Sequence, residues 1–208
     1  MACMDSMPPT KPFWETTYQN PTGNTFGKPS PEMIAIADKL PTKASVLDLG
    51  CGEGRNALFL AERGFDVTAV DISEHGISKL RLLASQRNIP IRAAVADMRS
   101  FAYNQQFDLI ISHGCLHLIE RAAWQLVLSQ MKVHTSAGGY NIVAVFTDQI
   151  APSPDLEAFC VGLFRENELF SFYSGWEIQL QQSYTFTDEH PGGVRHTHPL
   201  NKIVASKM

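Results

Sequence analysis

The chain has 208 residues, enough for one domain with a full hydrophobic core and too few for a separate substrate domain. Its net charge is −4 and its Lys and Arg residues are scattered without a basic stripe, which argues against nucleic acid as a partner. No apolar run approaches the roughly 20 residues of a membrane helix, and the first residues lack the order of a signal peptide, so we expect no membrane association and a cytoplasmic location. The four cysteines form no CxxC pair and predict neither a zinc knuckle nor a disulfide framework.

The first segment, residues 1–31, is rich in proline, threonine and aromatic residues. Its aromatic side chains follow no helical or strand period, and we expect an arm or lid that precedes a domain over residues 32–208. Ser30 and Pro31 supply an N-cap and a first-turn proline for a helix over residues 32–40.

An apolar strand over residues 46–49 then enters the turn Gly50-Cys51-Gly52-Glu53-Gly54 and a helix. Asp48 near the end of the strand and Glu53 in the turn are unsuited to a pyrophosphate, because fixed negative charge spoils the anion site of a helix N-terminus. Arg55 also stands where the dinucleotide fingerprint would place its last glycine. S-adenosylmethionine fits better, since it has no phosphate and carries a cationic sulfonium and ammonium.

Two further acids follow at the ends of predicted strands. Asp71 ends a strand over residues 65–71, at the edge where an open α/β sheet binds ligands, and it could accept both ribose hydroxyls. A third strand, residues 91–96, ends at Asp97 and Met98. Asp97 could meet the adenine amino group, with Met98 against the ring. The alternative is a domain that binds nothing and whose glycines only form tight turns.

Three segments, VLDLGCGEGR (46–55), AVDIS (69–73) and ADM (96–98), occur in an order that resembles the class I methyltransferases dependent on S-adenosylmethionine. The resemblance implies a single-domain, Rossmann-like α/β fold with a mostly parallel seven-stranded sheet, an antiparallel C-terminal strand and helices on both faces. The cofactor-binding residues that it implies are Asp48, Gly50, Cys51, Gly52, Gly54, Arg55, Asn56, Asp71, Ile72, Asp97, Met98, Ser112 and His113.

The rest of the chain continues the α/β pattern. Ser73 is predicted to cap a helix that reaches about Asn88. The remaining predicted elements are a strand over 107–112, a helix over 120–133, a strand over 140–146, a short helix around 166–172, and a closing antiparallel pair, 176–186 and 200–205, with a His- and Gly-rich loop between its strands.

Histidines are the main candidates for contact with a methyl acceptor. His113 ends the fourth strand, where it could line the cofactor pocket or act on the acceptor, and His117 follows on the same face, where a partly buried helix histidine is the more ordinary interpretation. The C-terminal loop adds a group that we expect to converge on an anionic acceptor, unless it is a solvated hairpin tip: His190, Arg195, His196 and His198. His190, His196 and His198 could instead hold a metal ion, but Arg195 would repel it, and no metal is predicted.

Over nearly its full length the chain resembles the tellurite-resistance methyltransferase family, TehB-like. The resemblance implies methylation of a tellurite- or selenite-type oxyanion, with His190 and Arg195 beside it and His113 as a third catalytic candidate. This chain departs from the family pattern at Pro191, where an arginine is expected. Two alternatives remain: a methyltransferase for a small organic thiol, amine or hydroxyl compound, and a non-catalytic regulatory module that binds S-adenosylmethionine. We expect a monomer or a homodimer.

Overall fold

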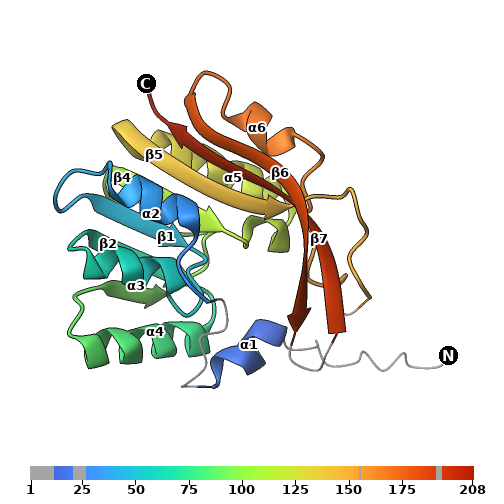
Figure 1. Ribbon diagram of the computed structural model, residues 1–208, viewed down its shortest axis with the longest axis horizontal. Coiled ribbons are helices and arrows are strands. Elements are labelled where there is room, and N and C mark those ends of the chain that lie inside the picture. The colour runs from blue at the N-terminus through green and yellow to red at the C-terminus, as the bar shows by residue number, and fades with distance from the viewer. Residues whose placement is uncertain (1–11, 21–26, 155, 191–193) are drawn as a thin grey trace.

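A computed structural model describes residues 12–20, 27–154, 156–190 and 194–208 (Figure 1). Its centre is a seven-stranded sheet with the order β3-β2-β1-β4-β5-β7-β6. The neighbours from β3 to β5 are parallel, and β7 is antiparallel to both β5 and β6. The predicted fold class is confirmed. The strands are β1 (Ser45–Leu49), β2 (Asp66–Asp71), β3 (Arg92–Val95), β4 (Phe107–His113), β5 (Thr135–Phe146), β6 (Glu177–His190) and β7 (Val194–Ser206).

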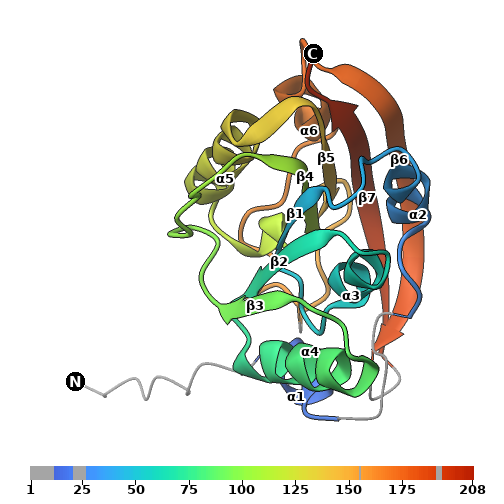
Figure 2. The ribbon, with the colours of Figure 1, turned by 90° about the vertical axis from the view of Figure 1, so that its left-hand side faces the viewer.

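Helices cover both faces of the sheet (Figure 2). They are α1 (Phe13–Tyr18), α2 (Pro31–Ala37), α3 (Arg55–Glu62), α4 (Glu74–Arg87), the 3₁₀ helix η1 (Leu116–Leu118), α5 (Arg121–Val133) and α6 (Glu168–Phe172). Ser73 caps α4 as predicted, because its hydroxyl accepts a hydrogen bond from the Gly76 N–H at 2.9 Å. Within the described ranges, every helix is too short or too polar to span a bilayer.

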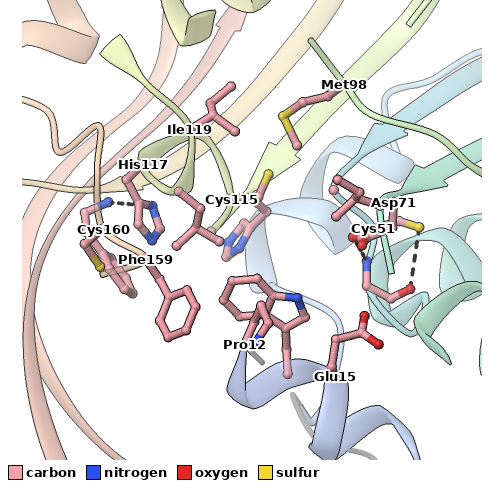
Figure 3. A pocket seen from close by; sticks show the side chains of 18 of the residues that line it. Pro12, Glu15, Cys51, Asp71, Met98, Cys115, His117, Ile119, Phe159 and Cys160 are labelled. Atoms are coloured by element: carbon pink, nitrogen blue, oxygen red, sulfur yellow. Dashed lines mark hydrogen bonds between the residues drawn. The ribbon is translucent and has the colours of Figure 1, made fainter. Parts of the chain in front are cut away.

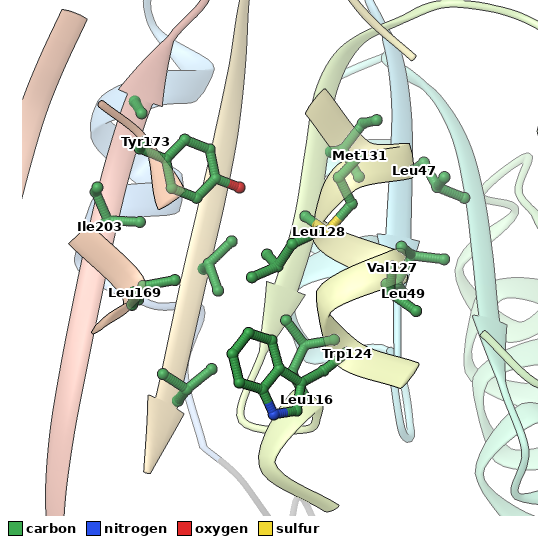
Figure 4. Close-up of a cluster of buried hydrophobic side chains, with 14 of the residues drawn as sticks. Leu47, Leu49, Leu116, Trp124, Val127, Leu128, Met131, Leu169, Tyr173 and Ile203 are labelled. Carbon is green, nitrogen blue, oxygen red and sulfur yellow. The ribbon is translucent and has the colours of Figure 1, made fainter. Parts of the chain in front are cut away.

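Side chains of the strands alternate between two buried clusters, as the period of two dictates. In β1, Leu47 and Leu49 join one cluster with α5 and α6, while Val46 joins the other with α2 and α3. Figure 4 shows Trp124 and Leu128 of α5 in the first cluster. Burial of each such side chain contributes about 1.5–3 kcal/mol, so the two clusters hold the strand ends in fixed positions.

The last three strands are longer than the sequence predicts. β5 begins at Thr135 instead of residue 140, because Gly138 and Gly139 lie inside the strand at a register shift and not in a turn before it. The strands β6 and β7 pair as far as His190 and Val194, so most of the predicted loop is strand. The β-branched residues Thr187, Val194 and Thr197 of this stretch favour extended backbone.

The N-terminal arm also differs from the expectation. Residues 13–18 form the helix α1, which lies beside α4 in Figures 1 and 2. The segment is only six residues long, too short for a helical period to be recognised in the sequence. Residues 1–11 and 21–26 of the predicted lid lie outside the described residues.

Candidate functional site

A cavity of about 710 Å³ opens at the carboxyl ends of the parallel strands and is bordered by α1. This volume lies within the roughly 300–1,000 Å³ of small-molecule sites. Asp71, Cys51 and Met98 lie on one side of it, and His117 and Phe159 lie on the other (Figure 3). We call these sides the glycine-turn half and the aromatic half.

Most of the residues predicted to bind the cofactor line this cavity. They are Asp48, Gly50, Cys51, Gly52, Arg55, Asn56, Asp71, Ile72, Asp97, Met98 and His113. Two predicted residues do not. Ser112 is completely buried, with its hydroxyl 3.1 Å from Cys115 Sγ. Gly54 packs against α4, where a Cβ atom would lie 2.6 Å from Leu80 Cγ.

The glycine turn needs glycine at two positions that face the cavity. Gly50 and Gly52 have φ values of +73° and +56°, a region that disfavours residues with side chains. A Cβ atom on Gly50 would lie 2.4 Å from Cys115 Sγ, and one on Gly52 would lie 2.4 Å from Tyr18 Oη. The turn therefore brings bare backbone against both α1 and the strand-end loop after β4.

Asp71 is held at the end of β2 by backbone donors. The N–H groups of Gly52 and Ser73 each donate to one of its carboxylate oxygens at 2.8 Å. Burial raises the pKa of Asp71, although these two hydrogen bonds act in the opposite direction. A carboxylate has about four acceptor positions, so Asp71 retains the capacity to accept hydroxyl hydrogens from a ligand.

Two acids at the glycine turn, Glu53 within it and Asp48 on the strand before it, differ in their surroundings. Glu53 pairs with Lys79 of α4 at 2.6 Å, and each of these side chains is only 3% exposed. Asp48 is also buried, and burial raises its pKa to about 7, although the charge of Arg55 lowers it. The sequence did not reveal that a lysine neutralises Glu53, because Lys79 is 26 positions further along the chain.

Asp97 and Met98 border the glycine-turn half from the end of β3. Arg99 binds the Asp97 carboxylate as a fork, with Nε and Nη2 2.9 and 2.6 Å from Oδ2. These hydrogen bonds lower the pKa of Asp97. The carboxylate thus lines the cavity as a stable anion that shares its acceptor positions with Arg99.

His113 is engaged through both ring nitrogens. Arg55 Nη2 lies 3.3 Å from Nδ1, which must accept because a guanidinium has only donors. The proton of the neutral ring is therefore on Nε2, which is 3.0 Å from Glu32 Oε1 and 3.2 Å from Ser30 Oγ. Burial lowers the pKa of His113. Ser30 occupies the predicted N-cap position, but its hydroxyl caps no backbone group and contacts His113 instead.

Fewer of the C-terminal candidates line the cavity than the sequence predicts. Among the described side chains of this group, His198 lines the cavity, whereas Arg195 is exposed and His196 is buried outside the lining. The side chain of His190 lies outside the described part of the chain. Side chains of β7 alternate between the two faces of the sheet, so Arg195 points to the face opposite His196 and His198. For this reason Arg195 does not line the cavity as predicted. No metal-binding group of three His, Cys, Asp or Glu side chains occurs among the described residues.

The aromatic half combines two histidines predicted from the sequence, His117 and His198, with phenylalanines that the sequence did not single out. The Phe146 ring lies between two imidazoles, with centroids 4.1 Å from His117 and 4.3 Å from His198. Phe159 and Phe186 also line this half. These side chains come from η1, β5, β6, β7 and the connection after β5. Because they are dispersed along the chain, no local sequence motif predicts the aromatic half.

The helix α1 closes the cavity from the side opposite the sheet. Its Trp14 ring meets Phe159 edge-on at 5.6 Å between centroids, and Glu15 Oε2 lies 2.7 Å from His75 Nδ1 of α4. Tyr18 packs on the glycine turn at Gly52. Short as it is, α1 therefore contacts both halves of the cavity.

Solved structures place this architecture in a known class. The crystal structure of TehB from Haemophilus influenzae matches with a TM-score of 0.77 and 28% identity, over 86% of this chain and 62% of that one. A methyltransferase structure from Methanosarcina mazei matches with a TM-score of 0.68 at 19% identity, which shows the fold. Together these matches show that the chain has the Rossmann-like fold of the class I methyltransferases.

The sequence comparisons give the family. The family described as "Tellurite resistance protein TehB" matches residues 28–190, and the chain belongs to this family. The "Probable S-adenosyl-L-methionine-dependent methyltransferase TehB" of Haemophilus influenzae is 36% identical over 147 residues, 70% of this chain and 50% of that protein. The chain thus spans about half the length of the TehB relatives it matches. The 2-heptyl-1-hydroxyquinolin-4(1H)-one methyltransferase of Mycobacteroides abscessus is 30% identical over 138 residues, 64% of this chain and 59% of that protein.

Proposed function

We propose that the chain transfers the methyl group of S-adenosylmethionine to a small, uncharged organic acceptor. The observation that carries this proposal is the division of one cavity into a glycine-turn half lined by acids and an aromatic half lined by Phe146, Phe159 and Phe186. The acids of the glycine-turn half suit a cationic methyl donor, and the aromatic side chains of the other half suit an apolar methyl acceptor.

The residues of the glycine-turn half fit the donor. Asp71 is held with acceptor positions available for ribose hydroxyls, and Gly50 and Gly52 bring the backbone of the turn to the cavity wall. Asp97 and Met98 line the same half, and in this proposal they contact the adenine amino group and ring. When bound, S-adenosylmethionine supplies an electrophilic methyl group on a sulfonium, a charge that the nearby acids favour.

The chain itself then contributes orientation and exclusion of water. The helix α1 covers the cavity through Trp14 and Tyr18, which removes solvent from the reacting atoms. His113 is poorly suited to accept a proton, because Arg55 and Glu32 occupy its two nitrogens. Its role in this proposal is to position Arg55 at the cavity wall. Acceptors that arrive with an available lone pair are therefore favoured.

The family description favours a second candidate, a tellurite-type oxyanion. An oxyanion would need cations, but the two arginines of the lining are engaged, Arg55 with His113 and Arg99 with Asp97. Arg195, expected beside the oxyanion, lies outside the lining. The relative that acts on a hydroxyquinolone supports an organic acceptor instead.

Turnover with a panel of acceptors tests the proposal. The purified protein is incubated with S-adenosylmethionine and, in separate reactions, with tellurite, selenite, a thiol, an amine and a hydroxyquinolone, and products are identified by mass spectrometry. We expect acceptor-dependent formation of S-adenosylhomocysteine with an organic compound. Turnover with tellurite or selenite alone would support the second candidate, and cofactor binding without turnover on any acceptor would support the regulatory module.

A further inference from the structure

His117 presents a hydrogen-bond donor to the aromatic half of the cavity. The Phe146 N–H donates to its Nδ1 at 3.3 Å, so the neutral ring carries its proton on Nε2. The side chain lines the cavity and the residue is only 1% exposed, and within the described part of the chain Nε2 makes no hydrogen bond. Because this N–H faces the cavity, a ligand that accepts from it gains the net free energy of one neutral hydrogen bond, about 0.5–1.5 kcal/mol.

This donor remains uncharged at physiological pH. Burial, with the neighbouring His198, lowers the pKa of His117 to about 3. The N–H therefore suits a neutral lone pair, such as a ring nitrogen or a carbonyl oxygen, without supplying the charge that an oxyanion would need.

The surrounding rings fix the plane of the imidazole. The planes of His117 and Phe146 make an angle of 25°, and those of Phe146 and His198 an angle of 11°, so the three rings form one stack. Figure 3 shows His117 and Phe159 on the same side of the cavity. Aromatic walls of this kind bind planar rings by offset stacking or edge contact.

We propose that the acceptor is an uncharged planar ring compound that lies in the aromatic half and accepts a hydrogen bond from His117 Nε2. This inference rests on the proposed function and narrows its acceptor to a chemical class. In this inference His117 determines specificity, because it favours acceptors whose ring system carries a lone pair over those without one.

Two probes of equal shape isolate this hydrogen bond. Quinoline and naphthalene differ by one ring atom, and the nitrogen lone pair of quinoline is uncharged at pH 7.5. Their dissociation constants are measured by tryptophan fluorescence at pH 7.5 with S-adenosylhomocysteine present. We expect quinoline to bind about twofold to tenfold more tightly than naphthalene, the effect of one neutral hydrogen bond.

The preference should disappear in His117→Leu and persist in His134→Leu, a control outside the cavity lining. If His117→Leu does not fold, as judged by its melting temperature, nitrogen-15 NMR of the wild-type imidazole decides, since quinoline and not naphthalene should shift the Nε2 resonance. Equal binding of the two probes, a preference retained in His117→Leu, or no binding of either probe would overturn the inference. Absence of turnover on every acceptor, with the quinoline preference intact, would instead refute the proposed methyl transfer.

Discussion

Asp71 joins the glycine turn to the start of α4 while it faces the cavity. Its oxygens accept from Gly52 and Ser73, so the carboxylate is oriented before any ligand binds. Asp71→Asn should weaken the binding of S-adenosylmethionine by about 1–1.5 kcal/mol, because a charge-assisted hydrogen bond becomes a neutral one. Calorimetry measures the change. Asp66→Asn, exposed at the other end of β2, is the matched control, and an equal dissociation constant for wild type and Asp71→Asn would remove this assignment.

At the residue scale, the sequence predicted those cavity residues whose signal lies in neighbouring positions of the chain. Gly50, Gly52 and Asp71 were found because each stands at a predicted strand end and needs no distant partner to be recognised. The partners of His113 could not be predicted, since Ser30 and Glu32 are 83 and 81 positions away. His117 and His198 were acceptor candidates in the sequence and both line the cavity, but their stacking on Phe146 could not be predicted, because that ring belongs to a third segment.

The helix α4 approaches the glycine turn through Gly76. A Cβ atom there would lie 2.9 Å from the carbonyl oxygen of Gly52 and 3.2 Å from Tyr18 Cδ2. Gly76→Ala should therefore destabilise the protein, because overpacking costs about 1–3 kcal/mol while the gain in helix propensity is at most about 1 kcal/mol. It should also weaken cofactor binding, because the turn must shift.

Chemical denaturation and calorimetry of Gly76→Ala check both effects. Ser78→Ala, on the exposed side of α4, serves as the control. A Gly76→Ala variant that is more stable than wild type and binds the cofactor equally well would show that the turn and α4 are not tightly packed.

At the element scale, long periodic segments were predicted and short or pairing-dependent ones were not. The helix α4 was predicted from its cap to Asn88, and its C-cap does lie at Asn88. The helix α1 was missed because its stability comes from contacts with α4 and not from its own pattern. The full length of β6 and β7 depends on their mutual pairing, which the sequence of either strand alone does not encode.

At the scale of the whole molecule, Glu32 connects the helix α2 to the last strand, β7. Its carboxylate binds His113 on β4 and lies 3.1 Å from Lys202 Nζ on β7. Burial alone would raise the pKa of Glu32, but the hydrogen bond from His113 and the charge of Lys202 lower it to about 2. One carboxylate thus connects three distant parts of the chain.

The pH dependence of stability follows from this shift. The folded pKa of about 2 lies below the ordinary value of 4.5, so the unfolded chain takes up the proton first as the pH falls. The stabilisation by Glu32 is therefore complete above about pH 4.5 and is lost towards pH 2. In Glu32→Gln, the slope of unfolding free energy against pH in this window should fall by up to one proton, about 1.4 kcal/mol per pH unit.

Urea denaturation between pH 2.5 and 6 measures this slope. Glu62→Gln, half-exposed on α3 and paired with Arg87, is the control and should leave the slope nearly unchanged. The same slope in wild type and Glu32→Gln would mean that Glu32 is not strongly coupled to His113 and Lys202.

The central claim about the whole molecule is that the glycine-turn half of the cavity binds the methyl donor and the aromatic half binds the acceptor. A crystal structure with S-adenosylhomocysteine tests this claim most directly. We predict that the ribose lies at Asp71, the adenine beside Asp97 and Met98, and the sulfur toward the half that contains His117 and Phe146. A product molecule whose sulfur faces away from the aromatic half, or whose ribose does not contact Asp71, would contradict the account.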